Sequence, residues 1–131
     1  MTLFENAVKL RGFLVKDAEV PTSDRTEVDS FAVLLLATMS GTWDIATNEW
    51  IPHTACHRVV CPGPYFCGFT RGMKHGDYVE VEGELHVFDY DRPVIVEGEH
   101  FTAKRYVCEV RAIQVRRLER PLTVVDTSED G

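Results

Sequence analysis

Apolar and polar residues alternate with a period of two along most of the chain, which is the pattern of β-strands with one buried face. The clearest stretch is Tyr78–Val87, where apolar residues alternate with Glu80, Glu82 and Glu84, and we expect these glutamates to face solvent. Similar alternation predicts a first strand over Val8–Leu14. Long stretches with the helical period of 3.6 are nearly missing, so the chain is predicted to be all-β.

Three further strands are predicted from the same pattern. The second covers about Val28–Thr38 and the third about Trp50–Cys61. In the last strand the apolar positions change from even to odd numbers at Ile113, which indicates a bulge. We expect Met39–Glu49 to be a long loop or hairpin tip, and Asp89–His100 to be a solvent-rich hairpin that leads to the last strand.

One short helix is expected between the third and fourth strands. Phe66, Phe69 and Met73 recur there with the spacing of one helical face. Five strands with a helix at this place are the layout of an oligonucleotide/oligosaccharide-binding (OB) barrel. An immunoglobulin-type sandwich would need about seven strands.

Composition and charge narrow the classes of function. A chain of 131 residues with 44% hydrophobic residues predicts one globular domain, which we place at residues 1–120, followed by a short acidic tail at 121–131. The net charge is −7, and three acids of the tail leave −4 for residues 1–125. This is the wrong sign for a protein that holds nucleic acid by bulk charge, so the distribution of cations must decide any such binding.

Nothing in the sequence predicts a membrane or an export route. The longest apolar run, Phe31–Ala37, is far shorter than the roughly 20 residues that a spanning helix needs, and Met1–Lys9 lacks the apolar core of a secretory signal. We therefore expect a cytoplasmic protein whose four cysteines are thiols rather than disulfides.

Several motifs occur in a defined order over about Asn6–Leu118. The most specific are His57-Arg58-Val59-Val60, Gly76-Asp77-Tyr78-Val79-Glu80-Val81-Glu82-Gly83 and Arg105-Tyr106. Together they resemble the bacterial-type single-stranded-DNA-binding proteins. The resemblance implies an OB barrel, usually a homotetramer, that coats single-stranded DNA in replication, recombination and repair without catalysing a reaction.

Such binding rests on bases that stack on exposed rings and on cations that contact phosphates. Seven candidate DNA-binding residues follow from the resemblance and the local sequence: Trp43, Trp50, Thr54, Arg58, Lys74, Tyr90 and Arg105. Trp50 has no aromatic counterpart in the family pattern, and we expect it to replace a lost ring. We prefer Tyr90 to Phe88, which we place on the opposite side of the same strand. The alternatives are strand packing for the rings and surface ion pairs for the cations.

The chain departs from the family pattern at several positions. A family tryptophan is Cys56 here, a family phenylalanine is Pro62, and a family lysine beside Tyr90 is Asp89. The hydrophobic tip that recruits repair enzymes is also missing from the tail, which argues against that role. The alternative is an accessory OB protein of the replication-restart type that acts mainly through protein contacts.

Assembly is expected through the first strand as an unpaired sheet edge, with Val8 and Leu10 on it, and the resemblance places His57 at a subunit contact. A tetramer is favoured over a dimer.

A zinc site is a further alternative, because His53, Cys56, His57 and Cys61 are all possible ligands. In an unbroken strand, however, Cys56 points away from the other three. Their spacing also matches no zinc motif, and no base or oxyanion site accompanies the cysteines. We expect no metal, no cofactor and no catalytic residue.

Overall fold

The computed structural model describes residues 3–21 and 30–120, within which five strands form a closed barrel. The strands are β1 (Val8–Leu14), β2 (Phe31–Asp44), β3 (Glu49–Pro62), β4 (Tyr78–Val96) and β5 (Glu99–Leu118), and helix α1 (Pro64–Thr70) connects β3 to β4. Their order around the barrel is β1-β2-β3-β5-β4, with β3 and β5 parallel and the other neighbours antiparallel. This confirms the predicted five-stranded OB barrel. The proposed tail at 121–131 lies outside the described residues.

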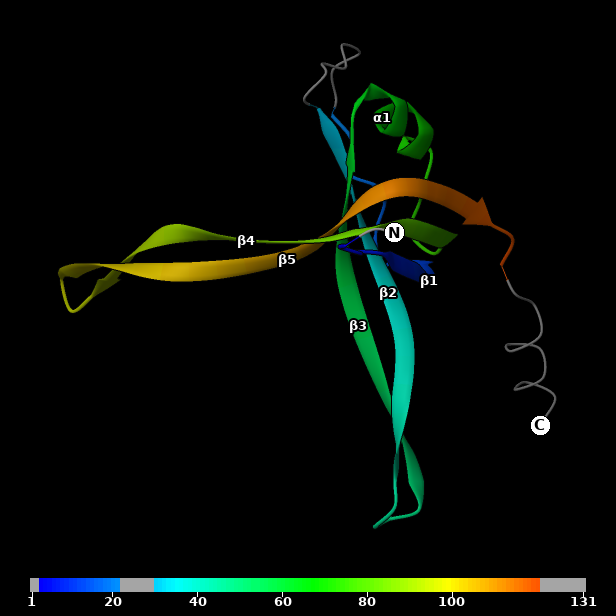
Figure 1. Cartoon of the computed structure of the whole chain (residues 1–131), viewed down its shortest axis with the longest axis horizontal. Coiled ribbons are helices and arrows are strands. Elements are labelled where there is room, and N and C mark those ends of the chain that lie inside the picture. The colour runs from blue at the N-terminus through cyan, green and yellow to red at the C-terminus, as the bar shows by residue number, and fades with distance from the viewer. Residues whose placement is uncertain (1–2, 22–29, 121–131) are drawn as a thin grey trace.

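Two strand pairs extend beyond the barrel as long arms, which leave it in different directions in Figure 1. Strands β2 and β3 pair without interruption out to Asp44 and Glu49, and β4 and β5 pair out to Val96 and Glu99. The hairpin expected around Asp89–His100 is confirmed, and Met39–Glu49 forms a hairpin tip, but paired strands extend through most of both stretches, further than the sequence predicted. Alternation of apolar residues arises when one face of a strand is buried, and both faces of these arms are largely exposed.

The tips of the arms are tight turns in left-handed backbone. Asn48 has a φ of 59°, and its N–H donates to the carbonyl oxygen of Asp44 over 2.8 Å. At the other tip both central residues have positive φ, Glu97 at 52° and Gly98 at 81°, which is the pattern of a type I′ hairpin turn. These turns fix the register along each arm.

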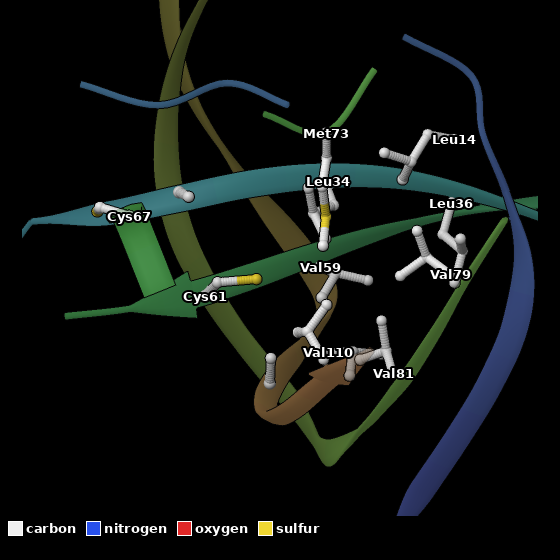
Figure 2. Packing of buried hydrophobic residues seen from close by; sticks show 13 residues of the cluster. Leu14, Leu34, Leu36, Val59, Cys61, Cys67, Met73, Val79, Val81 and Val110 are labelled. Atoms are coloured by element: carbon white, nitrogen blue, oxygen red, sulfur yellow. The ribbon is translucent and has the colours of Figure 1, made fainter. Parts of the chain in front are cut away.

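The hydrophobic core fills the interior of the barrel, and Figure 2 shows its side chains. Its largest fully buried apolar side chains are Leu14, Leu34, Leu36, Val59, Val79 and Val81. The helix contributes Cys67 and Thr70, and Met73 follows just after it. The expectation that Phe69 shares the buried face was wrong, because Phe69 is exposed and stacks against Tyr65.

Two glycines permit close passage of neighbouring strands. A Cβ atom at Gly12 would overlap the carbonyl oxygen of Ala37, where β1 crosses β2. Gly83 lies beside a register shift, in which Glu82 pairs with Gln114 and Gly83 pairs with Ala112. Ile113 is thus the extra residue of a bulge in β5, as the sequence pattern predicted.

Candidate nucleic-acid interface

The outer face of the barrel is defined where β3 and β5 run side by side. Val59 pairs with Val110 and both are buried, so both point inward. Their neighbours Arg58 and Glu109 therefore point outward, and Arg58 Nε donates to Glu109 Oε2 over 3.0 Å. This contact joins the outer faces of the two arms into one surface, which we call the outer face.

The β2–β3 arm presents two tryptophans on the outer face. Trp43 lies directly opposite Trp50 in the register, and Trp50, Thr54 and Arg58 share one face of β3 because they differ by even numbers. Trp43 is 52% exposed and Trp50 is 58% exposed. These exposed fractions argue against core packing and leave both rings available to a ligand.

Trp50 lies against the backbone of β2 rather than extending into solvent. Gly41 is its diagonal neighbour, and a Cβ atom at residue 41 would collide with the six-membered ring and Nε1 of the indole. Gly41 therefore leaves the space that the indole occupies. No pattern in the sequence predicted this role, because Gly41 lies in a stretch expected to be a long loop or hairpin tip.

The β4–β5 arm adds Tyr90 and Arg105, which pair directly with each other. Tyr90 is half exposed. The placement of Phe88 on the opposite side of this strand was wrong, since residues 88 and 90 of an unbroken strand share a face. The ring of Phe88 contacts that of His86, two residues away, with 5.2 Å between the ring centroids. Phe88 is therefore a further ring of the outer face.

A cleft of about 490 Å³ lies where the two arms meet. It is lined by Ser30, Phe31, Arg58, Val60, Pro62, His86, Phe88, Glu109 and Arg111. Glu109 is central to its charge, because its carboxylate accepts from Arg58 and its Oε1 is 3.7 Å from His86 Nδ1. The cleft is thus an aromatic and cationic hollow with one acid at its base.

Asp89 does not place a negative charge on the outer face. It is one residue from Tyr90 and so points to the opposite face of the arm. There Lys104 Nζ is 3.9 Å from Asp89 Oδ2. Asp89 stands where the family pattern has a lysine, but it adds no negative charge beside Tyr90.

Lys74 is not brought to this surface. It lies in the turn between α1 and β4, where its Nζ is 3.8 Å from Asp17 Oδ2. Cys56 and Pro62 do lie on the outer face of β3, at even-numbered positions with Trp50. These two positions, which carry rings in the family pattern, present none here.

The candidate subunit-contact residues lie away from the tryptophans. Val8 and Leu10 are half-buried against the core. His57 is on the other face of β3 from Arg58, with its Nε2 2.8 Å from Thr38 Oγ1. Within the described residues, the stretch from Val8 to Gly12 pairs with β4 only, which leaves its other edge unpaired.

The expectation that Glu80 faces solvent was wrong. Its side chain is 2% exposed, because Arg11, Arg116 and Lys9 fold over it. Arg11 Nη2 is 2.6 Å from one carboxylate oxygen, and Arg116 Nε is 3.0 Å from the other. The hydrogen bonds from Arg11 and then Arg116 lower the pKa of Glu80 to about 2. The alternation of apolar and polar residues along one strand does not predict this cluster, because its members come from three strands.

The cysteines are free thiols in two environments. Cys56 and Cys108 are exposed, whereas Cys61 and Cys67 are buried. Burial raises the pKa of Cys61 to about 12, which makes it a poor nucleophile and metal ligand. Among residues 3–21 and 30–120, no three His, Cys, Asp or Glu side chains are grouped to hold a metal ion. The described helix is also too short to span a membrane.

Comparisons with known proteins agree on the fold. The sequence matches no protein-family model and no curated protein. Among solved structures, it is similar to the single-stranded-DNA-binding protein of Plasmodium falciparum in complex with single-stranded DNA, with a TM-score of 0.64 and 21% identity. That match covers 91% of this chain and 99% of the other.

Two bacterial proteins show the same likeness. A deletion mutant of the single-stranded-DNA-binding protein from Thermus aquaticus has a TM-score of 0.63 and 24% identity over 88% of this chain and 51% of that one. A small single-stranded-DNA-binding protein from Streptomyces coelicolor has a TM-score of 0.54 and 19% identity, covering 88% and 95%. The chain therefore has the OB-barrel fold of single-stranded-DNA-binding proteins.

Proposed function

We propose that this protein binds single-stranded DNA without catalysis, by base stacking and phosphate contacts on the outer face. The observation that carries the proposal is the gathering of Trp43, Trp50 and Tyr90 on one continuous surface with Arg58 and Arg105. Exposed rings bind bases of any sequence because every base has a π-face, and cations beside them follow the phosphates. The fold shared with single-stranded-DNA-binding proteins supports the same reading.

We assign the protein to DNA replication, recombination or repair, where single strands are exposed. Thr54 belongs to the interface as a hydrogen-bonding residue beside Trp50, whereas Lys74 contributes only through its charge at a distance. Recruitment of repair enzymes through residues 121–131 is not part of the proposal.

The working unit is proposed to be a homo-oligomer, a tetramer rather than a dimer, with β1 as one contact. The unpaired edge of Val8–Gly12 supports this, because an exposed strand edge pairs readily with a second copy. His57 and its partner Thr38 belong to a contact separate from the DNA surface.

A fluorescently labelled oligothymidine strand tests the proposal by anisotropy, with a duplex of equal length as the control. We expect submicromolar affinity for the single strand and much weaker duplex binding. Tyr90→Ala should lower the affinity about tenfold, while Tyr65→Ala, an exposed ring on α1, should leave it unchanged. Weak binding that is insensitive to salt would instead indicate an accessory protein that acts through protein contacts.

A further inference from the structure

Glu109 lies between two basic side chains in the cleft where the arms meet. One carboxylate oxygen, Oε2, accepts from Arg58 Nε over 3.0 Å, and the other, Oε1, is 3.7 Å from Nδ1 of His86. Only 11% of the Glu109 side chain is exposed, so the carboxylate is shielded from bulk water. The positive charge that Arg58 offers to a ligand therefore depends on how Glu109 is neutralised.

His86 is only partly engaged in this arrangement. Its Nδ1 atom is buried and has no hydrogen-bond partner among the described residues. At 3.7 Å the nitrogen is too far from Glu109 for a hydrogen bond. A neutral imidazole thus leaves a buried polar atom unpaired, which is unfavourable. Protonation makes both ring nitrogens donors, and Nδ1 then becomes a charged donor that faces a carboxylate.

The other charges around His86 do not offset this ion pair. In the register of β4 and β5, Glu84 lies opposite Arg111, on the same face as His86 and Glu109. The cation beside His86 therefore comes with an anion directly across the strand pair. Strand β2 contributes the uncharged Phe31 to the lining of the cleft. Among the described residues, Glu109 is thus the carboxylate that a protonated His86 meets.

A second carboxylate, that of Glu19, lies within electrostatic range of Arg58. The hydrogen bond and charge of Lys16, and then the charge of Arg58, lower the pKa of Glu19. Lys16 is the ion-pair partner of Glu19, only three residues away. Among the described ion pairs, the direct partner of Arg58 is therefore Glu109.

We propose that His86 is a proton-linked switch that controls how strongly Glu109 opposes the charge of Arg58. The inference rests on the proposed function of the outer face. When His86 is neutral, the charge of Arg58 is offset by Glu109. When His86 takes up a proton from solvent, its imidazolium neutralises Glu109 through Oε1, and the charge of Arg58 becomes available to a phosphate. A histidine ordinarily changes charge between about pH 5 and 8, so mild acid should strengthen the binding of single-stranded DNA.

Proton uptake during binding tests the switch in the parent protein. If protonation strengthens binding, binding must in turn promote protonation, because coupling between two sites is reciprocal. The parent should therefore take up protons when it binds oligothymidine at about pH 6.5, as measured by isothermal titration calorimetry in buffers of different ionisation enthalpy. His86→Gln should abolish the uptake. His53→Gln is the matched control and should retain it, because His53 lies on the opposite face of β3 from Arg58 and contacts Thr42.

Affinities for oligothymidine at about pH 8 and about pH 5.5 test the route through Glu109. The parent should bind about fivefold more tightly at the lower pH, and His86→Gln should lose this pH dependence. Glu109→Gln imitates the neutralised acid, so it should bind tightly at both pH values. A histidine that only added its own charge to the surface would keep its effect on affinity in Glu109→Gln.

Three results would overturn the switch while leaving the proposed function intact. They are a parent that binds without taking up protons, a pH dependence of affinity that is equal in His86→Gln and the parent, and a pH dependence that persists in Glu109→Gln. A parent that binds oligothymidine at neither pH would instead overturn the proposed function. Far-UV circular dichroism at both pH values checks that each variant is folded.

Discussion

Trp43 and Trp50 face each other across the β2–β3 arm, as directly opposed residues of one antiparallel register. Both indoles are more than half exposed. Both side chains lie on one face of the strand pair, near the end of an arm that extends away from the core. We propose that this strand pair serves as a stacking platform in place of the rings that Cys56 and Pro62 do not supply.

The position of the Trp50 ring depends on Gly41. Gly41→Ala places a methyl group where the indole now lies and forces the ring off the strand. We expect about tenfold weaker binding of oligothymidine, similar to the loss of one stacked base, although both tryptophans are still present. Ser40→Ala, on the opposite face of β2, is the control and should bind as the parent does. An affinity of Gly41→Ala equal to that of the parent would show that the position of the Trp50 ring does not affect binding of oligothymidine.

Glu109 limits the charge that Arg58 offers to a phosphate. With a body charge of −4 and Arg58 paired to Glu109, the parent should show a shallower dependence of affinity on salt than a basic groove would. Glu109→Gln removes the acid, raises affinity at low salt and steepens the slope by about 0.7 for each phosphate newly neutralised. Glu84→Gln is the control for the loss of a single negative charge. Equal slopes for parent and Glu109→Gln would contradict this role.

We expect the fold to lose stability at acid pH mainly because Glu80 becomes protonated. Its pKa of about 2 lies below the ordinary value of 4.5, so the folded state favours the ionised form. This stabilisation is complete above about pH 5 and is lost as the pH falls toward 2. In urea unfolding, Glu80→Gln should be less stable than the parent at pH 7 and should lose less stability over this range. Glu82→Gln, whose carboxylate contacts only Lys9 among the described ion pairs, should follow the parent. Parallel pH curves for Glu80→Gln and the parent would refute the assignment.

Assembly through β1 can be tested at Lys9. Leu14 exchanges hydrogen bonds with Asp77 and Gly76 on the β4 side, while Val15 donates to Leu35 of β2. Since successive N–H groups point to opposite edges, the N–H of Lys9 points away from β4. Lys9→Pro removes that donor at the unpaired edge, whereas Lys9→Ala removes only the charge.

We expect the proline variant to be smaller than the parent by light scattering and the alanine variant to keep the parent's size. Arg11 is a poorer site for this test, because its side chain is committed to Glu80 within the same chain. A folded Lys9→Pro protein of unchanged size would place the subunit contact elsewhere.

The sequence predicted those parts of the fold in which one face is buried. Alternation in Tyr78–Val87 and Val8–Leu14 placed β4 and β1 correctly, and the change of parity at Ile113 located the bulge in β5. Beyond Met39 and Asp89 the strands have no buried face, so their pairing left no periodic signal. The length of both arms was consequently underestimated, and the role of Gly41 was missed with it.

The sequence predicted which residues belong to the candidate site better than it predicted how they are arranged. Trp43, Trp50, Arg58, Tyr90 and Arg105 fall on one face, but this follows from the continuous register of arms whose strands were expected to end earlier. Phe88 was misplaced although parity alone could have located it. The pairing of Arg58 with Glu109 joins residues far apart in sequence, and no local pattern encodes it.

The central claim is that single-stranded DNA stacks on the two tryptophans, and tryptophan fluorescence during a titration with oligothymidine measures this most directly. We predict strong quenching that saturates together with binding measured by anisotropy, and partial loss of the quenching in both Trp43→Phe and Trp50→Phe. A saturating strand that binds by anisotropy but leaves the emission unchanged would exclude both rings as platforms and contradict the account.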